Sequence, residues 1–157
     1  MIFFDSILVF VFVFVIGICL GSFANVCIYR LPRNKQAITG RSFCPKCKKT
    51  IRWFDNLPLI SFLLLNGKCR KCHKSISLEY FIVELITGIG FLLIYLNSNN
   101  YHAIIFLSVL FILYLIIFFI DLKHSIIPDS LNFSIMGLAI FKNFLPNFNT
   151  SFIHDIN

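Results

Sequence analysis

Long apolar blocks alternate with short polar segments along the chain. The blocks cover residues 2–28, 78–96, 101–120 and 131–145. About 20 apolar residues in a helix cross a hydrocarbon core about 30 Å thick, so each of the first three blocks is long enough to span a bilayer. The fourth block is shorter and weaker, and an interfacial or core helix is its alternative. The pattern predicts an all-α membrane protein with three to four transmembrane helices.

The overall composition supports lipid as the solvent. The 157 residues are 58% hydrophobic and only 13% charged, whereas about a quarter of the residues in a soluble domain are charged. A cleaved signal peptide begins with a positively charged region. Here Asp5 is the only charged residue before Arg30. The first block is therefore predicted to remain as a membrane span.

The positive charges lie almost entirely between the first two spans. Twelve of the fourteen Lys and Arg residues fall within residues 30–74. Positive charge is concentrated in cytosolic loops of membrane proteins, which predicts an external N-terminus and a cytosolic loop over residues 30–77. The second span then runs outward and the third returns to the cytosol at Asp121. Because topology accounts for the net charge of +7, we expect no nucleic-acid partner.

Four cysteines in this loop form two CxxC pairs separated by 21 residues: Cys44, Cys47, Cys69 and Cys72. Two such pairs can direct four thiolates at one point, as in a zinc ribbon. Disulfides or unengaged thiols are the alternatives, but cytosolic thiols are kept reduced, and four unrelated cysteines rarely show this spacing. The spacing predicts a bound metal, zinc ahead of iron, held in a structural site, because four protein ligands leave no open position for chemistry.

Other residues of the loop and first span are assigned no metal role. His73 follows the last cysteine and is expected to be a solvated neighbour. Cys19 and Cys27 lie in the first span, where cysteine behaves as a small hydrophobic residue. An apolar patch separates the two cysteine pairs and either packs on the metal site or lies against the membrane surface; it comprises Trp53, Phe54, Leu57, Leu59, Ile60 and residues 62–65.

Polar and small residues at membrane depth divide into packing positions and candidate sites. Gly17, Gly21 and Asn25 recur every four residues and predict a helix-packing face, since small residues allow close approach and Asn can bond to a neighbouring helix. Glu84 lies inside the second span, where a carboxylate is costly and commonly functional. Its alternative role is to extend to the nearby interface.

Two aspartates flank the turn after the third span. Asp121 directly follows twenty uncharged residues and is a candidate acid/base group, although an aspartate at the end of a helix is also common. Asp129, followed by Ser130, is expected to cap the fourth helix.

These motifs together resemble the N-terminal half of the prepilin leader peptidases. The resemblance extends in order from about residue 17 to 135. It is carried by Gly21-Ser-Phe-Ala-Asn-Val26, Tyr29-Arg-Leu-Pro32, the paired CxxC loop, Leu57-Pro-Leu-Ile-Ser61, Gly67-Lys-Cys69, Ile76-Ser-Leu-Glu-Tyr80, Val83-Glu-Leu-Ile-Thr-Gly88, Phe119-Ile-Asp-Leu122 and Ile127-Pro-Asp-Ser130.

The resemblance implies a multi-pass enzyme of the bacterial cytoplasmic (inner) membrane. Such enzymes cleave the leader from type IV prepilins and pseudopilins of pilus and protein-secretion systems, using two aspartates. Many also methylate the new N-terminus with S-adenosylmethionine, an activity associated with the four-cysteine loop. The first catalytic position corresponds to Asp121, while Asp129 matches a motif residue and, like Glu84, is an accessory candidate.

The resemblance further implies a division into a first transmembrane helix (1–29), the cytosolic zinc loop (30–77) and the start of a membrane peptidase domain (78–157). The family's second catalytic aspartate lies in a Gly-x-Gly-Asp motif that these 157 residues do not contain. We therefore expect a truncated or split product that is inactive alone. A second polypeptide that carries the missing half, or an oligomer, would restore activity. The alternative function is a non-catalytic membrane adaptor whose zinc loop binds prepilins or secretion machinery.

Overall fold

The computed structural model describes residues 2–33, 36, 40–126 and 128–142. It contains the helices α1 (Ile2–Arg30), α2 (Ile60–Leu64), α3 (Leu78–Asn97), α4 (Tyr101–His124) and α5 (Asp129–Lys142), with 3-10 turns η1 (Leu31–Arg33) and η2 (Trp53–Asn56). Two isolated β-bridges occur in the cysteine loop, and the described residues form no longer strand. The prediction of an all-α fold is confirmed.

Three of these helices, α1, α3 and α4, are long and apolar enough to cross a membrane. Their bounds agree closely with the first three apolar blocks, because a bilayer requires an uninterrupted apolar helix of this length. The fourth block forms α5, whose 14 described residues are fewer than the about 20 that a span requires. The last three residues of that block, 143–145, lie outside the described part of the chain.

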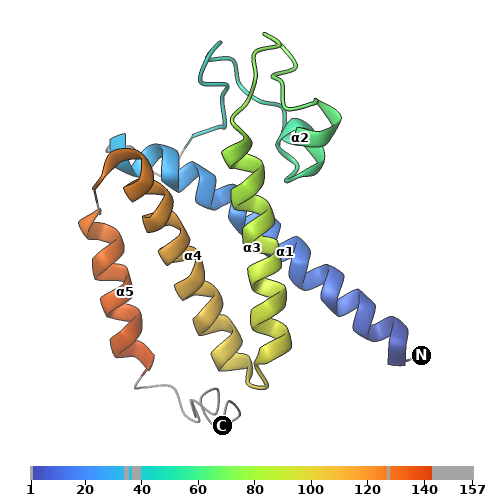
Figure 1. Cartoon of the computed structure of the whole chain (residues 1–157), viewed down its shortest axis with the longest axis vertical. Helices are drawn as coiled ribbons and strands as arrows, with labels where there is room; N and C mark the ends of the chain where they lie inside the picture. Colours follow the sequence, from blue (N-terminus) through green and yellow to red (C-terminus); the bar gives the residue numbers. More distant parts are fainter. Residues whose placement is uncertain (1, 34–35, 37–39, 127, 143–157) are drawn as a thin grey trace.

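The helix α1 crosses α3 obliquely, while α3, α4 and α5 lie side by side (Figure 1). Glycines occupy the crossing point of α1 and α3. A Cβ added to Gly17 would lie 2.8 Å from the Cα of Gly88, and one added to Gly21 would lie 2.9 Å from the Cα of Glu84. Asn25 donates a hydrogen bond from Nδ2 to the carbonyl of Tyr80 at 2.9 Å. The packing face predicted from residues 17, 21 and 25 is confirmed.

Local hydrogen bonds set the helix ends. The Ser77 hydroxyl accepts from the Glu79 N–H at the start of α3, and the Asn100 side chain accepts from the His102 N–H at the start of α4. Such caps satisfy backbone groups that the helix leaves without partners. At the end of α4, Lys123 pairs with Glu79 at 2.6 Å. This ion pair joins the end of α4 to the start of α3, beside the cysteine loop.

The loop is fixed to the end of α1 through Arg30. This side chain is buried, and its guanidinium donates to the carbonyls of Gln36 and Gly40, each at 3.2 Å, and of Arg41 at 3.4 Å. A buried guanidinium needs several acceptors, and three loop carbonyls provide them. The loop therefore begins at a defined position relative to the membrane helices.

Candidate functional site: a four-cysteine centre beside a membrane-facing cavity

The two CxxC segments have the same backbone structure, repeated 25 residues apart. In the first, the Cys44 N–H donates to Lys49 and its carbonyl accepts from Lys48. In the second, Cys69 makes the corresponding bonds with Lys74 and His73, at the same distances of 3.0 and 2.8 Å. Lys48 and His73 both adopt positive φ, 56° and 54°, which turns the chain back after each pair. Each segment is therefore a tight turn with two cysteines at its tip.

The two turns bring the four sulfurs together. The Sγ atoms of Cys44, Cys47, Cys69 and Cys72 all lie within 4.8 Å of one another, and those of Cys44 and Cys72 are 3.9 Å apart. Tetrahedral Zn–S bonds of about 2.3 Å place sulfurs about 3.8 Å apart. The cluster therefore fits a metal ion with little adjustment. His73 is exposed and does not belong to the cluster, and Cys19 and Cys27 lie apart from it.

Backbone groups favour the thiolate form of one of these ligands. Hydrogen bonds from the N–H groups of Cys72 and Lys71 lower the pKa of Cys69 to about 7. Metals bind the thiolate rather than the thiol. The second turn thus contributes to the ligand set through its backbone as well as its side chains.

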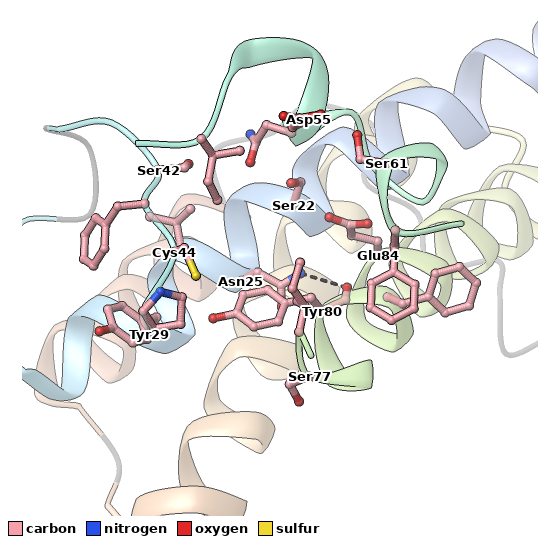
Figure 2. A pocket seen from close by; sticks show the side chains of 18 of the residues that line it. Ser22, Asn25, Tyr29, Ser42, Cys44, Asp55, Ser61, Ser77, Tyr80 and Glu84 are labelled. Carbon is pink, nitrogen blue, oxygen red and sulfur yellow. Dashed lines mark hydrogen bonds between the residues drawn. The ribbon is translucent and has the colours of Figure 1, made fainter. Parts of the chain in front are cut away.

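A cavity of about 510 Å³ lies between the cysteine loop and the membrane helices. Its lining comes from α1, the loop, α2 and α3, with Lys123 from the end of α4. Figure 2 shows Ser22 and Glu84 beside each other in this lining, with Tyr29 and Cys44 toward the opposite side in that view. Cys44 is 5% exposed and belongs to both the cysteine cluster and the cavity. The cluster and the cavity are therefore parts of one structure.

Glu84 is the buried acid of this cavity. It is 8% exposed. Its Oε2 accepts a 2.8 Å hydrogen bond from the N–H of Leu59, and its carboxylate also hydrogen-bonds with Ser22. The carboxylate thus joins α1, α3 and the loop.

The donor at Leu59 is held in an uncommon backbone conformation. Leu59 has φ 57° and ψ −48°, and the Ile60 N–H bonds back to the Pro58 carbonyl. This is a γ-turn with positive φ, which is rare and strained. Strain of this kind persists only where the surrounding structure fixes it, commonly at functional sites. Here it directs the Leu59 N–H toward Glu84.

The two aspartates lie outside the cavity lining. Asp121 is exposed in the last turn of α4, and its carbonyl accepts from the Ser125 N–H at 2.8 Å. Asp129 is exposed in the first turn of α5, where its charge favours the helix dipole. It is part of the helix rather than its cap residue. Asp121 nevertheless lies two residues from Lys123, which lines the cavity.

Sequence reasoning did not identify the cavity. Ser22, Tyr29 and Tyr80 received no role from it, and Arg30 was interpreted only through its charge. The signal available was the polar residue at every third or fourth position of the first span, from Ser22 through Asn25 to Tyr29. A cavity between a helix and a distant loop requires the tertiary fold to be known.

Comparison with known proteins supports the motif analysis. Residues 15–98 match the bacterial peptidase A24 N-terminal domain. The chain is similar to prepilin leader peptidase/N-methyltransferases, with 43% identity over 134 residues to that of Vibrio cholerae and 40% over 121 residues to that of Myxococcus xanthus. A third, from Klebsiella pneumoniae, is 38% identical over 139 residues. No solved structure matches the chain.

The matches cover most of this chain but less of its relatives. They include 80%, 77% and 84% of the chain and 53%, 36% and 60% of the three relatives, respectively. The chain thus spans between about a third and three fifths of the length of these relatives.

Proposed function

The chain belongs to the bacterial peptidase A24 family through its N-terminal domain, and we propose that it forms part of a membrane enzyme that removes leader peptides from type IV prepilins or pseudopilins and methylates the new N-terminus. The relatives are named for both a prepilin leader peptidase and an N-methyltransferase. The methyl donor is S-adenosylmethionine.

One observation carries the proposal. The helices α1 and α4 end, and α3 begins, at the side of the bundle that carries the loop between α1 and α3 (Figure 1). The four cysteines belong to this loop, the cavity lies between it and the helices, and Asp121 is in the last turn of α4. The basic loop is at the same end, so the positive-inside rule assigns this end to the cytosol. The protein then lies in the bacterial inner membrane with its N-terminus outside. Residues 30–77 form the cytosolic domain, and residues 78–157 begin the peptidase domain.

Asp121 is the catalytic carboxylate that this chain contributes. In a pair of aspartates, the ionised member activates water and the protonated member polarises the scissile carbonyl. The partner carboxylate is supplied from outside residues 1–157, by further chain or by a second polypeptide. The exposed position of Asp121 leaves it accessible to such a partner. Asp129 stabilises the start of α5, the helix that follows the turn after Asp121.

The four cysteines hold a structural zinc ion. Four thiolates complete a tetrahedral zinc site and leave no position for water or substrate. The ion supplies folding free energy to the loop, as in small zinc domains. Cys44 also lines the cavity, so the metal site fixes the shape of this part of the cavity wall.

The test is leader cleavage of a prepilin in membranes that contain this chain together with a separately expressed Gly-x-Gly-Asp half of a relative. We expect cleavage by the wild-type pair, loss with Asp121→Asn and retention with the matched Asp129→Asn. Cleavage that survives Asp121→Asn would exclude Asp121 as the catalyst.

Two further measurements test the remaining parts of the proposal. A periplasm-active reporter inserted at residues 97–100 should be active, and one inserted between the cysteine pairs should be inactive; the reverse would overturn the topology. If the chain binds prepilins but no complementing half restores cleavage, the adaptor function would replace the peptidase.

A further inference from the structure

The acids at the cytosolic end of the helices differ in their partners. Glu79 pairs with Lys123 at 2.6 Å, and Asp55 pairs with Arg70 at 2.8 Å. Within the described part of the chain these are the two ion pairs, and Glu84 belongs to neither. Glu84 is nonetheless the most deeply placed of the three along the membrane helices. A buried carboxylate without a cation is costly, so its position calls for a function.

The hydrogen bonds of Glu84 leave acceptor capacity. An ionised carboxylate offers about four lone-pair sites. The N–H of Leu59 occupies one of them at Oε2, and Ser22 accounts for another. These neutral donors orient the carboxylate without neutralising it. The remaining capacity belongs to a group that lines or enters the cavity.

The cavity itself is suited to the end of an apolar peptide. Its volume of about 510 Å³ lies within the range of small-ligand sites. Its lining includes the apolar and aromatic side chains of Leu57, Phe62 and Phe81, with the Phe62 and Phe81 rings 5.3 Å apart. Such a lining holds an apolar side chain, while the acid selects a positive charge next to it.

The lining also contains four basic side chains: Arg30, Arg33, Lys46 and Lys123. Arg30 is buried and donates to three loop carbonyls. Arg33 stacks over the Tyr29 ring at 4.2 Å and donates to the Tyr29 carbonyl, and Lys123 is paired with Glu79. Neither ion pair of the described residues includes Glu84, so its carboxylate remains available to a positive group that enters the cavity.

We propose that Glu84 binds the free α-ammonium group of a processed, apolar pilin N-terminus in this cavity and positions it for methylation. This inference rests on the proposed N-methyltransferase function. It identifies the residue that binds the methyl acceptor, the α-amino group of the processed N-terminus.

The proton balance follows from the carboxylate. The bound ammonium group transfers one proton to Glu84, and the amine nitrogen gains a free lone pair. That lone pair forms the new N–C bond. A sulfonium methyl donor supplies the methyl group, whose C–S bond electrons remain with the neutral thioether. The product is a secondary ammonium ion, and Glu84 releases its proton to water.

The first test measures binding to residues 1–157 in lipid nanodiscs. The probes are an apolar peptide that begins with phenylalanine and the same peptide with an N-acetyl cap. A hydrogen bond to a charged group is worth about 1.5–3 kcal/mol, so the free-amine peptide should bind about 10- to 100-fold more tightly. Glu84→Gln should reduce this ratio to near one. The matched Glu79→Gln variant, which removes the same charge from the same helix, should retain it.

A second test needs no variant, in case Glu84→Gln does not fold. A water-soluble carbodiimide should join the peptide α-amine to the Glu84 carboxylate of the wild-type chain as an amide, located by mass spectrometry. Equal binding of the two peptides, no binding of either, or a cross-link to another carboxylate would each overturn the proposal. Neither measurement requires leader cleavage. A chain that fails to cleave can therefore still pass these tests, and a chain that cleaves can still fail them.

Discussion

The crossing of α1 and α3 gives the most direct stability prediction, through Gly17→Ala. The added Cβ would lie 2.8 Å from the Gly88 Cα, 3.0 Å from the Thr87 carbonyl oxygen and 3.1 Å from the Phe91 Cβ, whereas ordinary contacts begin at 3.4 Å. Two of these neighbours are backbone atoms and cannot rotate away. The helices must therefore separate by roughly half an ångström or more, which weakens their dispersion contacts. Overpacking of this kind costs about 1–3 kcal/mol.

The matched control is Gly137→Ala in α5. A Cβ at Gly137 meets nothing within 4 Å. Replacing glycine by alanine inside a helix also favours the helix by up to about 1 kcal/mol, and this contribution cancels between the two variants. The difference in unfolding free energy, measured by SDS titration in bicelles with circular dichroism, should thus be about 1–3 kcal/mol. A difference below about 0.5 kcal/mol, the range of ordinary surface changes, would refute the close packing of α1 on α3.

Three further predictions concern the metal, the membrane surface and the helix interface. Elemental analysis of purified protein should find one zinc per chain, lost in Cys44→Ser and kept in Cys19→Ser; full retention by Cys44→Ser would contradict a four-sulfur site. Trp53 is the only tryptophan in the sequence, and its side chain is 77% exposed. If this surface lies against the membrane, brominated lipids should quench its fluorescence more than acrylamide does. The reverse order would place η2 in water. Asn25→Ala removes a hydrogen bond to α3 and should lower the free energy of unfolding by about 1 kcal/mol in the same SDS titration. The control Asn97→Ala, which changes an exposed side chain, should lower it much less. Equal losses in the two variants would show that the Asn25 hydrogen bond does not stabilise the protein.

The spans and the cysteine cluster were predictable because each depends on a local pattern. A bilayer requires a continuous apolar helix, so the blocks at 2–28 and 78–96 match α1 (Ile2–Arg30) and α3 (Leu78–Asn97) almost residue for residue. The CxxC spacing likewise fixes two ligands within one turn. Only the convergence of the two turns depends on the fold.

The cavity could not be predicted because its parts are brought together by tertiary contacts. The bond between Leu59 and Glu84 joins residues 25 positions apart, across a γ-turn that no sequence motif specifies. The short helix α2 (Ile60–Leu64) was missed for a related reason, since five residues show too little periodicity to identify a helix. The roles of Asp121 and Asp129 remain predictions, because they depend on a partner carboxylate outside these residues.

The cysteine centre has a consequence for the assembly of the spans. In sequence, residues 31–77 connect α1 to α3, and a metal that joins Cys44 to Cys72 shortens this connection to residues 31–43 and 73–77. The connection is then less than half as long, and each halving lowers the entropy cost of closing a loop by about 0.6 kcal/mol. Linkage is reciprocal, so pairing of the two spans should tighten metal binding by the same factor, about threefold. Metal binding by the loop and the packing of the two spans are in this way thermodynamically coupled.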